Sequence, residues 1–229
     1  MSKSTIGVSI LGFFLLSFSN HVAATTFAEV ITILSRFVQN PTQMGEVAPI
    51  SDSAGKELAK FVSQPAVVGK KYLEAGGGCG AVSVQIAEVL HPKDHLDVIE
   101  INPEMCEILC KRLQKYKNVS VHCCSILDWR PAYRYDGIIS TLPFNSLGID
   151  FTKKAIQYFK EVADKDCIVS YVEYPIVGQL LQHFYFGDQK INFQAVQEFL
   201  KSVREQWMLE KKVIYLNVPP IAIYHLCFN

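Results

Sequence analysis

The sequence predicts an α/β protein with a mostly parallel sheet of about seven strands, an antiparallel C-terminal hairpin and helices on both faces. Short apolar runs alternate with helical patterns along the chain, which is typical of strand–helix–strand units. The first run, residues 71–74, ends in an acid and a glycine-rich turn, and a helical pattern follows at once. The last two runs, 212–218 and 222–228, are joined closely through prolines, which indicates an antiparallel pair.

The strands are expected at residues 71–74, 96–100, 119–124, 135–140 and 167–172, followed by the closing pair. Helices are expected at 52–62, 81–90, from 102 onward with Met105, Ile108, Leu109 and Leu113 facing inward, around 151–162, and at 189–208. With 229 residues, the chain is long enough for one well-buried domain and short for two.

The turn after the first strand has the pattern Glu-x-Gly-x-Gly-x-Gly. Glycine accepts positive φ and has no Cβ, so Gly76, Gly78 and Gly80 allow the strand to turn sharply beneath a bound molecule. The spacing differs from the dinucleotide pattern G-x-G-x-x-G, and Glu74 places a carboxylate before the first glycine, where it would attract a cation. A glycine-rich surface turn is the alternative interpretation.

The second strand ends in Glu100, whose carboxylate is well placed to accept hydrogen bonds from ribose hydroxyls. A solvated strand end is the alternative. The fourth strand runs into residues 141–147, where Pro143 and Phe144 form a proline–aromatic turn. Such a turn would hold carbonyl groups toward a substrate amine, and the ring would face the positive charge of a methylated nitrogen. The alternative is an ordinary proline turn with a packed phenylalanine.

The glycine turn resembles motif I of the class I S-adenosylmethionine-dependent methyltransferases. Residues 140–147, Ser-x-Leu-Pro-Phe-x-Ser-Leu, resemble the motif IV loop of bacterial phospholipid N-methyltransferases and are close to the Asn-Leu-Pro-Tyr loop of ribosomal RNA adenine dimethyltransferases. Residues 40–49 and the tail 217–224 resemble the phospholipid family, although Ile50-Ser51 replaces its usual paired serines. The resemblance runs from about residue 37 to the end, with low similarity between about 176 and 207.

The resemblance implies a class I methyltransferase fold with S-adenosylmethionine as cofactor, whose cationic groups Glu74 would attract. The residues expected to bind it are Glu74, Gly76, Gly78, Gly80, Glu100, Ile101, Cys124 and Ser125. Cys124-Ser125 stands where the superfamily commonly has an acid that bonds the adenine amino group, and a thiol is a weak acceptor. The residues expected at the methyl acceptor are Ser140, Leu142, Pro143, Phe144 and Tyr174, with Glu173 or Tyr174 as a guessed general base.

The expected reaction is methyl transfer to the amine of a phospholipid headgroup, from phosphatidylethanolamine toward phosphatidylcholine, at a membrane surface. The alternatives are an rRNA adenine dimethyltransferase and a chain that keeps the fold without catalysis. The formal net charge of zero gives no electrostatic footprint for long nucleic acid. No Cys/His spacing is typical of a metal site, so no metal is expected.

Three segments are expected: residues 1–24 as a signal-like or anchoring leader, 25–64 as a helical lead-in with a cofactor-covering loop, and 65–229 as the methyltransferase domain. The leader has a charged start, an apolar run and small residues, as in a secretory signal, but an uncleaved anchor or an amphipathic segment fits too. The seven cysteines lack C-x-x-C pairs, which favours reduced thiols. A cytoplasmic, membrane-peripheral location is expected, with export or anchoring through the leader as the alternative.

Overall fold

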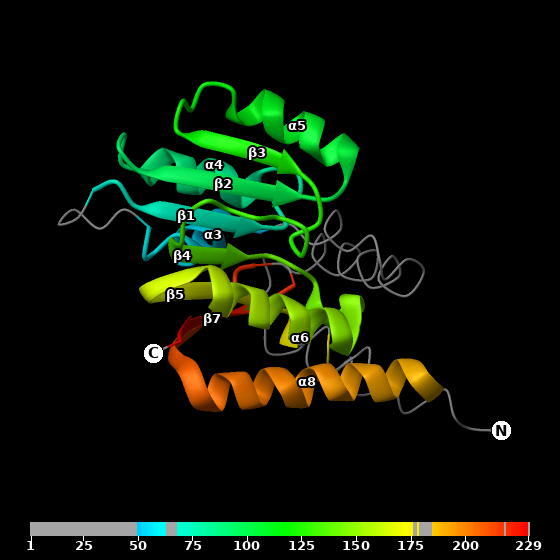
Figure 1. The fold of residues 1–229 in the computed structure, drawn as a ribbon. Helices are drawn as coiled ribbons and strands as arrows, with labels where there is room; N and C mark the ends of the chain where they lie inside the picture. The colour runs from blue at the N-terminus through cyan, green and yellow to red at the C-terminus, as the bar shows by residue number, and fades with distance from the viewer. Residues whose placement is uncertain (1–49, 63–67, 176–177, 179–184, 218, 229) are drawn as a thin grey trace.

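The computed structural model describes residues 50–62, 68–175, 178, 185–217 and 219–228 (Figure 1). The expected leader and residues 25–49 of the expected helical lead-in lie outside the described residues, so they stay predictions.

A seven-stranded sheet forms the centre of the domain, in the order β3-β2-β1-β4-β5-β7-β6. The strands are β1 (Lys71–Ala75), β2 (His95–Glu100), β3 (Val119–Cys123), β4 (Tyr135–Ser140), β5 (Ala163–Glu173), β6 (Met208–Ile214) and β7 (Ile221–Cys227). Strands β1 to β5 pair in parallel, and β7 is antiparallel to both β5 and β6. The predicted mixed sheet with a closing hairpin is confirmed, although β6 begins at Met208 and not at the expected 212.

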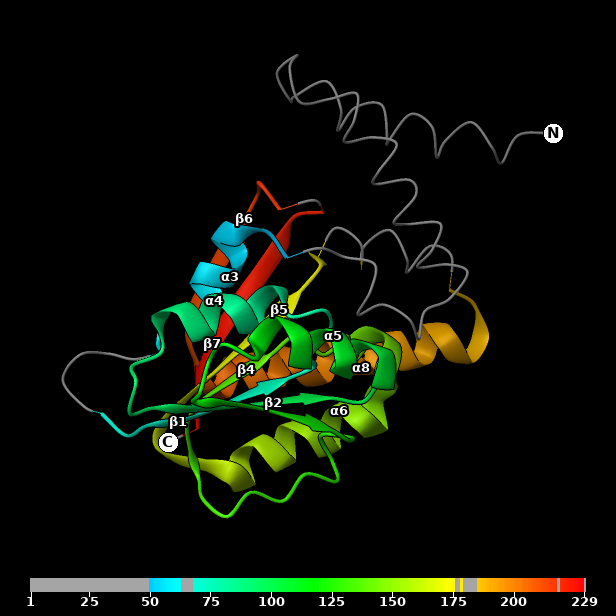
Figure 2. The ribbon, with the colours of Figure 1, turned by 90° about the horizontal axis from the view of Figure 1, so that it is seen from above.

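Helices cover both faces of this sheet (Figures 1 and 2). They include α3 (Asp52–Leu58), α4 (Ala81–Val89), α5 (Pro103–Leu113), α6 (Phe144–Val162) and α8 (Gly187–Trp207). One buried cluster joins the sheet to α6 and α8, and a second joins the opposite face to α3, α4 and α5. Because parallel strands buried on both faces expose only their ends, the loops at the carboxyl edge are where a ligand would bind.

Two expectations about the edge of the sheet are wrong. Leu109 and Leu113 of α5 are buried as expected, but Ile108 is exposed and Cys106 takes its place toward the core. Cys106 also forms a disulfide with Cys123, whose Cα lies 5.9 Å away, so these two cysteines are not reduced thiols. The disulfide forms because α5 packs beside β3. The sequence does not show this contact, since the two cysteines are 17 positions apart. That separation of Cα atoms is ordinary for a disulfide.

Among the residues that the structure describes, no helix is both long enough and apolar enough to cross a membrane.

Candidate functional site

The carboxyl edge of the sheet gathers the turns that follow β1, β2 and β4. Gly76 N–H donates to the carbonyl of Ile99 at 2.9 Å, which joins the glycine turn to β2. Thr141 N–H donates to the carbonyl of Ala75 at 3.1 Å, which joins the turn after β4 to β1. Strand order reverses at β1, since its neighbours β2 and β4 lie on opposite sides. Open α/β sheets bind ligands at such a switch point.

The glycine turn depends on positive φ and on the absence of side chains. Gly76, Gly78 and Gly80 have φ values of 87°, 53° and 88°, a region that other residues rarely adopt. A Cβ on Gly76 would lie 3.2 Å from Leu142 Cδ2, so the turns after β1 and β4 nearly touch. Gly77, which the alternate-glycine pattern did not include, is more tightly enclosed than Gly76 and Gly80, because its Cβ would lie 2.5 Å from Val98 Cγ1.

Glu74 is a fully buried acid, and no described residue forms a hydrogen bond with its carboxyl group. Its side chain has 0% exposure, and neither carboxyl oxygen is bonded within the described part of the chain. Burial raises the pKa of Glu74 to about 8; the nearby Ser83 hydroxyl opposes this shift, and the charge of Glu100 adds to it. Because an unsatisfied buried carboxyl is costly, Glu74 is suited to a ligand that brings hydrogen-bond donors or positive charge.

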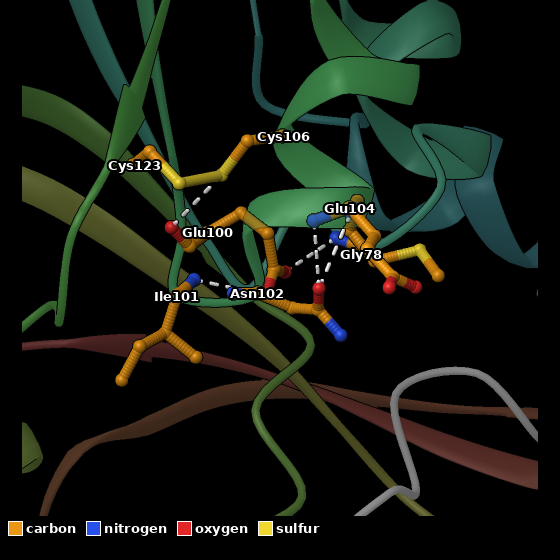
Figure 3. Close-up of a disulfide and its surroundings, with 8 residues drawn as sticks. Gly78, Glu100, Ile101, Asn102, Glu104, Cys106 and Cys123 are labelled. Atoms are coloured by element: carbon orange, nitrogen blue, oxygen red, sulfur yellow. Dashed lines mark hydrogen bonds between the residues drawn. A yellow bond between two sulfur atoms is a disulfide. The ribbon is translucent and has the colours of Figure 1, made fainter.

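Glu100 is held by backbone N–H groups of two turns (Figure 3). Its Oε1 accepts from Ile101 and Asn102, both at 2.9 Å, and its Oε2 accepts from Gly78 at 2.8 Å. A carboxylate has about four acceptor sites, so Oε2 keeps one for a ligand hydroxyl. Accepting both hydroxyls of a ribose would require one backbone bond to give way. Ile101 itself is exposed, and its side chain points away from the disulfide (Figure 3).

The turn after β3 lies next to Glu100. Cys124 N–H donates to the carbonyl of Glu100 at 3.0 Å, and burial raises the pKa of the half-buried Cys124 thiol, with the charge of Asp128 adding to it. Ser125 Oγ accepts from Leu127 N–H at 3.2 Å, so this hydroxyl already stabilises its own turn. The expected adenine contact of Cys124 and Ser125 stays a prediction.

The side chains and carbonyl groups of the turn after β4 face the protein interior more than expected. Ser140 is buried, and its Oγ accepts a long bond of 3.4 Å from Leu142 N–H. The Leu142 carbonyl accepts from Phe144 N–H at 2.9 Å, so one of its lone pairs is already used. Pro143 precedes the first turn of α6 as its N-cap residue.

Phe144 lies in the core beneath α6 and α8. Its side chain is 3% exposed, and its ring stands edge-on to Tyr171 with 6.0 Å between centroids. This packing agrees with the alternative interpretation of a proline turn with a buried phenylalanine, and the role in charge stabilisation stays a prediction. Sequence reasoning missed Thr141, whose Oγ1 donates to the carbonyl of Gly76 and ties the two turns together.

The two guessed bases lie at the end of β5, where Glu173 is the last residue of the strand and Tyr174 follows it. Tyr174 packs against the buried cluster that joins the sheet to α3, α4 and α5, and burial raises the pKa of its hydroxyl. Glu173 forms an ion pair with Arg204 of α8, a partner that the sequence did not suggest. Burial raises the pKa of Glu173 although Arg204 opposes that shift. Because Glu173 is already paired, it is poorly suited to remove a proton from a substrate.

Residues 73–166 match a family model described as a methyltransferase domain. An ornithine lipid N-methyltransferase of Singulisphaera acidiphila is 23% identical over 168 residues, which cover 70% of this chain and 86% of that protein. A protein-L-isoaspartate O-methyltransferase of Methanothrix thermoacetophila is 40% identical over 55 residues; the match covers 23% of this chain and 26% of that protein. The chain thus spans about a quarter of the latter relative.

Two solved methyltransferases have the same fold. The N-methyltransferase NodS of Bradyrhizobium japonicum, in complex with S-adenosyl-L-homocysteine, has a TM-score of 0.58 at 15% identity and covers 86% of this chain and 97% of its own. The O-methyltransferase TomG of Streptomyces achromogenes, in complex with S-adenosylmethionine, has a TM-score of 0.58 at 14% identity and covers 99% and 100%.

The described residues fit S-adenosylmethionine, which when bound supplies a methyl group on a cationic sulfur. Glu74 provides an unpartnered buried carboxyl for positive charge, the glycine turn leaves room for close approach, and Glu100 keeps an acceptor for a hydroxyl. Among the described residues, no cluster of three or more potential ligands would hold a metal ion. Residues 73–166 thus match a methyltransferase domain, and the fold that contains them is shared with solved class I S-adenosylmethionine-dependent methyltransferases.

Proposed function

We propose that the protein transfers a methyl group from S-adenosylmethionine to the amine of a phospholipid headgroup, with phosphatidylethanolamine as first acceptor. The motif IV loop and the relative that methylates ornithine lipid support a lipid acceptor. The observation that carries the proposal is a rim of exposed apolar side chains around the cofactor edge.

The five most exposed large apolar side chains among the described residues form this apolar rim. They are Leu216 (88%), Phe186 (78%), Tyr215 (70%), Ile101 (69%) and Ile191 (66%). All five belong to three segments at the carboxyl edge of the sheet, the edge that holds the glycine turn. Other exposed large apolar side chains of the described residues lie elsewhere and are less exposed.

The topology places each segment at that edge. Ile101 follows β2 directly, and Tyr215 and Leu216 follow β6, which runs in the same direction as β5 because β7 is antiparallel to both. The start of α8 is anchored there as well, since the side chain of Asn192 accepts a bond of 3.0 Å from Ile149 N–H in the first turns of α6. Figure 1 shows α8 running back along the sheet from that edge.

Exposed side chains of this kind are suited to the interface of a bilayer. Full burial of one Leu or Phe is worth about 1.5–3 kcal/mol, and several shallow insertions from separate loops would add. The formal net charge is zero, so docking on a zwitterionic phospholipid surface would depend on apolar contact more than on charge. This arrangement would present a headgroup amine to the turn after β4.

The chemistry asks little of the protein beyond placement. The amine must attack as the neutral base, and the buried surroundings of Ser140 and Leu142 would lower the pKa of an ammonium group brought there. Alignment of nitrogen, methyl carbon and sulfur supplies most of the rate acceleration. We therefore assign Ser140, Leu142 and Pro143 to orientation.

Incubation with methyl-labelled cofactor tests the proposal. Label in extracted phosphatidylethanolamine derivatives is expected. Label in rRNA and none in lipid would favour the adenine dimethyltransferase alternative, and failure to bind S-adenosylhomocysteine in calorimetry would favour a non-catalytic chain.

Sedimentation with vesicles of phosphatidylethanolamine and phosphatidylcholine tests the apolar rim separately. Replacing Tyr215 and Leu216 by serine is expected to lower the vesicle partition constant about tenfold, because about 1.4 kcal/mol of apolar burial would be lost. The matched control replaces Met208 and Leu209, two exposed residues at the opposite end of the same strand. Equal losses in both variants, or none in either, would contradict docking by the rim.

A further inference from the structure

The disulfide between Cys106 and Cys123 lies beside the turn that follows Glu100. Cys106 is the fourth residue of α5, and Cys123 is the last residue of β3 and the register partner of Glu100. The bond therefore ties the start of α5 to the neighbouring strand, and the turn from Glu100 to Asn102 lies between these two points (Figure 3).

This turn holds the Glu100 carboxylate through its own backbone. Ile101 and Asn102 both donate to Oε1, and the Asn102 side chain caps α5 by accepting from Glu104 N–H at 2.9 Å. A displacement of the first turn of α5 would therefore move both donors and, with them, the carboxylate. The glycine turn would follow, since Gly78 N–H donates to the other oxygen of Glu100.

We propose that Cys106 and Cys123 form a reversible thiol–disulfide pair that sets the affinity for the cofactor, with tight binding in the disulfide form. The disulfide fixes the donors around Glu100 before the ligand arrives, so less ordering is required on binding. The proposal rests on the cofactor site of the proposed function and is independent of the methyl acceptor.

The two sulfur atoms differ in access, which makes the exchange chemically simple. Cys123 is exposed, whereas Cys106 is 6% exposed. The thiolate of a small cellular thiol attacks the Cys123 sulfur, the protein disulfide breaks, and Cys106 leaves as a thiolate that takes a proton from water. A second small thiol attacks the mixed disulfide and releases Cys123 as a thiol. The two electrons come from the small thiols, which leave as one disulfide.

Calorimetry with S-adenosylhomocysteine on the oxidised and the reduced full chain tests the proposal. The reduced form is expected to bind about fivefold more weakly, the lower end of couplings between two sites. The variant Cys123→Ser is expected to bind as the reduced wild type and to ignore reductant. The matched control Cys110→Ser changes an exposed cysteine one turn along the same helix and is expected to keep the response to reductant.

Linkage supplies a readout that does not depend on catalysis. If the disulfide form binds the ligand fivefold more tightly, bound S-adenosylhomocysteine makes the disulfide fivefold harder to reduce. For a two-electron couple this shift is about 20 mV, measurable by thiol labelling in buffers of glutathione and its disulfide.

Equal affinities of the two forms, or tighter binding by the reduced form, would overturn the proposal while leaving the methyltransferase function intact. Absence of binding in both forms would overturn both. A reduction potential that does not change with ligand would overturn the coupling, because linkage requires the potential to shift whenever the two forms differ in affinity.

Discussion

Glu74 and Asp97 are buried acids on neighbouring strands, and their surroundings are opposite. Asp97 of β2 is 2% exposed; the hydroxyls of Tyr133 and Tyr135 donate to it at 2.6 and 2.9 Å, and His122 Nε2 lies 2.7 Å away. Glu74 of β1 is as deeply buried and has no hydrogen-bond partner among the described residues.

The pKa values follow these surroundings. Burial alone would raise the pKa of Asp97, but the contacts from Tyr133, His122 and Tyr135 hold it below its usual range. Burial raises the pKa of Glu74 to about 8. A satisfied buried acid serves the fold, whereas an unsatisfied one at a ligand-binding edge retains binding capacity for a partner.

The largest expected effect follows from removing the satisfied acid. Asp97→Ala leaves two tyrosine hydroxyls and a histidine without their acceptor and is expected to lower the free energy of unfolding by about 3–5 kcal/mol. Urea denaturation measures it, with the exposed Glu107→Ala on α5 as control, which should stay within about 0.5 kcal/mol. A loss below 1 kcal/mol would contradict the importance given to this network.

Removing the unsatisfied acid is expected to affect binding and not folding. Glu74→Gln keeps the volume but cannot ionise. The ammonium group of the ligand would favour the charged form of Glu74, and a charged hydrogen bond is worth about 1.5–3 kcal/mol, so the affinity for S-adenosylhomocysteine is expected to fall at least about tenfold. Calorimetry measures the affinity, and urea denaturation at pH 7 should show no loss of stability. Unchanged affinity would remove Glu74 from the site.

The raised pKa of Glu74 also predicts a pH dependence. The folded protein holds this proton up to about pH 8, whereas the unfolded chain releases it near 4.5. The contribution of Glu74 to the free energy of unfolding is therefore fully present below pH 4.5. It is lost as pH rises toward 8, at up to about 1.4 kcal/mol per pH unit. Denaturation of wild type and Glu74→Gln across this range isolates it. Parallel curves for the two proteins would show that Glu74 titrates normally.

The smallest effect is expected at the contact between the two turns. Thr141→Val removes the hydroxyl that donates to the Gly76 carbonyl while keeping the branched shape, and should lower stability by about 1 kcal/mol. Its matched partner Thr152→Val removes a buried hydroxyl that bonds the carbonyl of Gly148 in α6, away from the glycine turn. The free energy of unfolding should fall by a similar amount in both variants, but only Thr141→Val should weaken cofactor binding.

The order of elements and the meeting of Glu74 with Glu100 could be predicted from the sequence. Strand and helix periods are local signals, and acids that end neighbouring parallel strands necessarily share an edge. The identity of the Glu100 partners could not be predicted, because they are backbone groups whose direction depends on the turn. Gly77 was missed for a related reason. A Cβ at this position would clash with Val98, which lies on another strand.

Contacts between elements far apart in sequence could not be predicted, and the reason is the same for each. The disulfide depends on α5 lying beside β3, and the Glu173–Arg204 pair depends on α8 bringing Arg204 to the end of β5. The buried position of Phe144 depends on its packing against Tyr171. Periodicity says which side of an element is apolar, but not which element faces it. Turn motifs therefore predicted which turns share the carboxyl edge of the sheet better than they predicted the packing of the turn after β4.

The Asn217 side chain joins the start of the described domain to the hairpin that carries part of the apolar rim. Its Oδ1 accepts from Ser51 N–H at 2.8 Å, while its amide donates to the Pro219 carbonyl, also at 2.8 Å. This fully buried clamp fixes the point where the chain enters the described domain next to the tip of the β6–β7 hairpin. A tether joined ahead of Ser51 would thus pull from the carboxyl edge of the sheet, so that anchoring and the proposed headgroup binding would orient the domain in the same way.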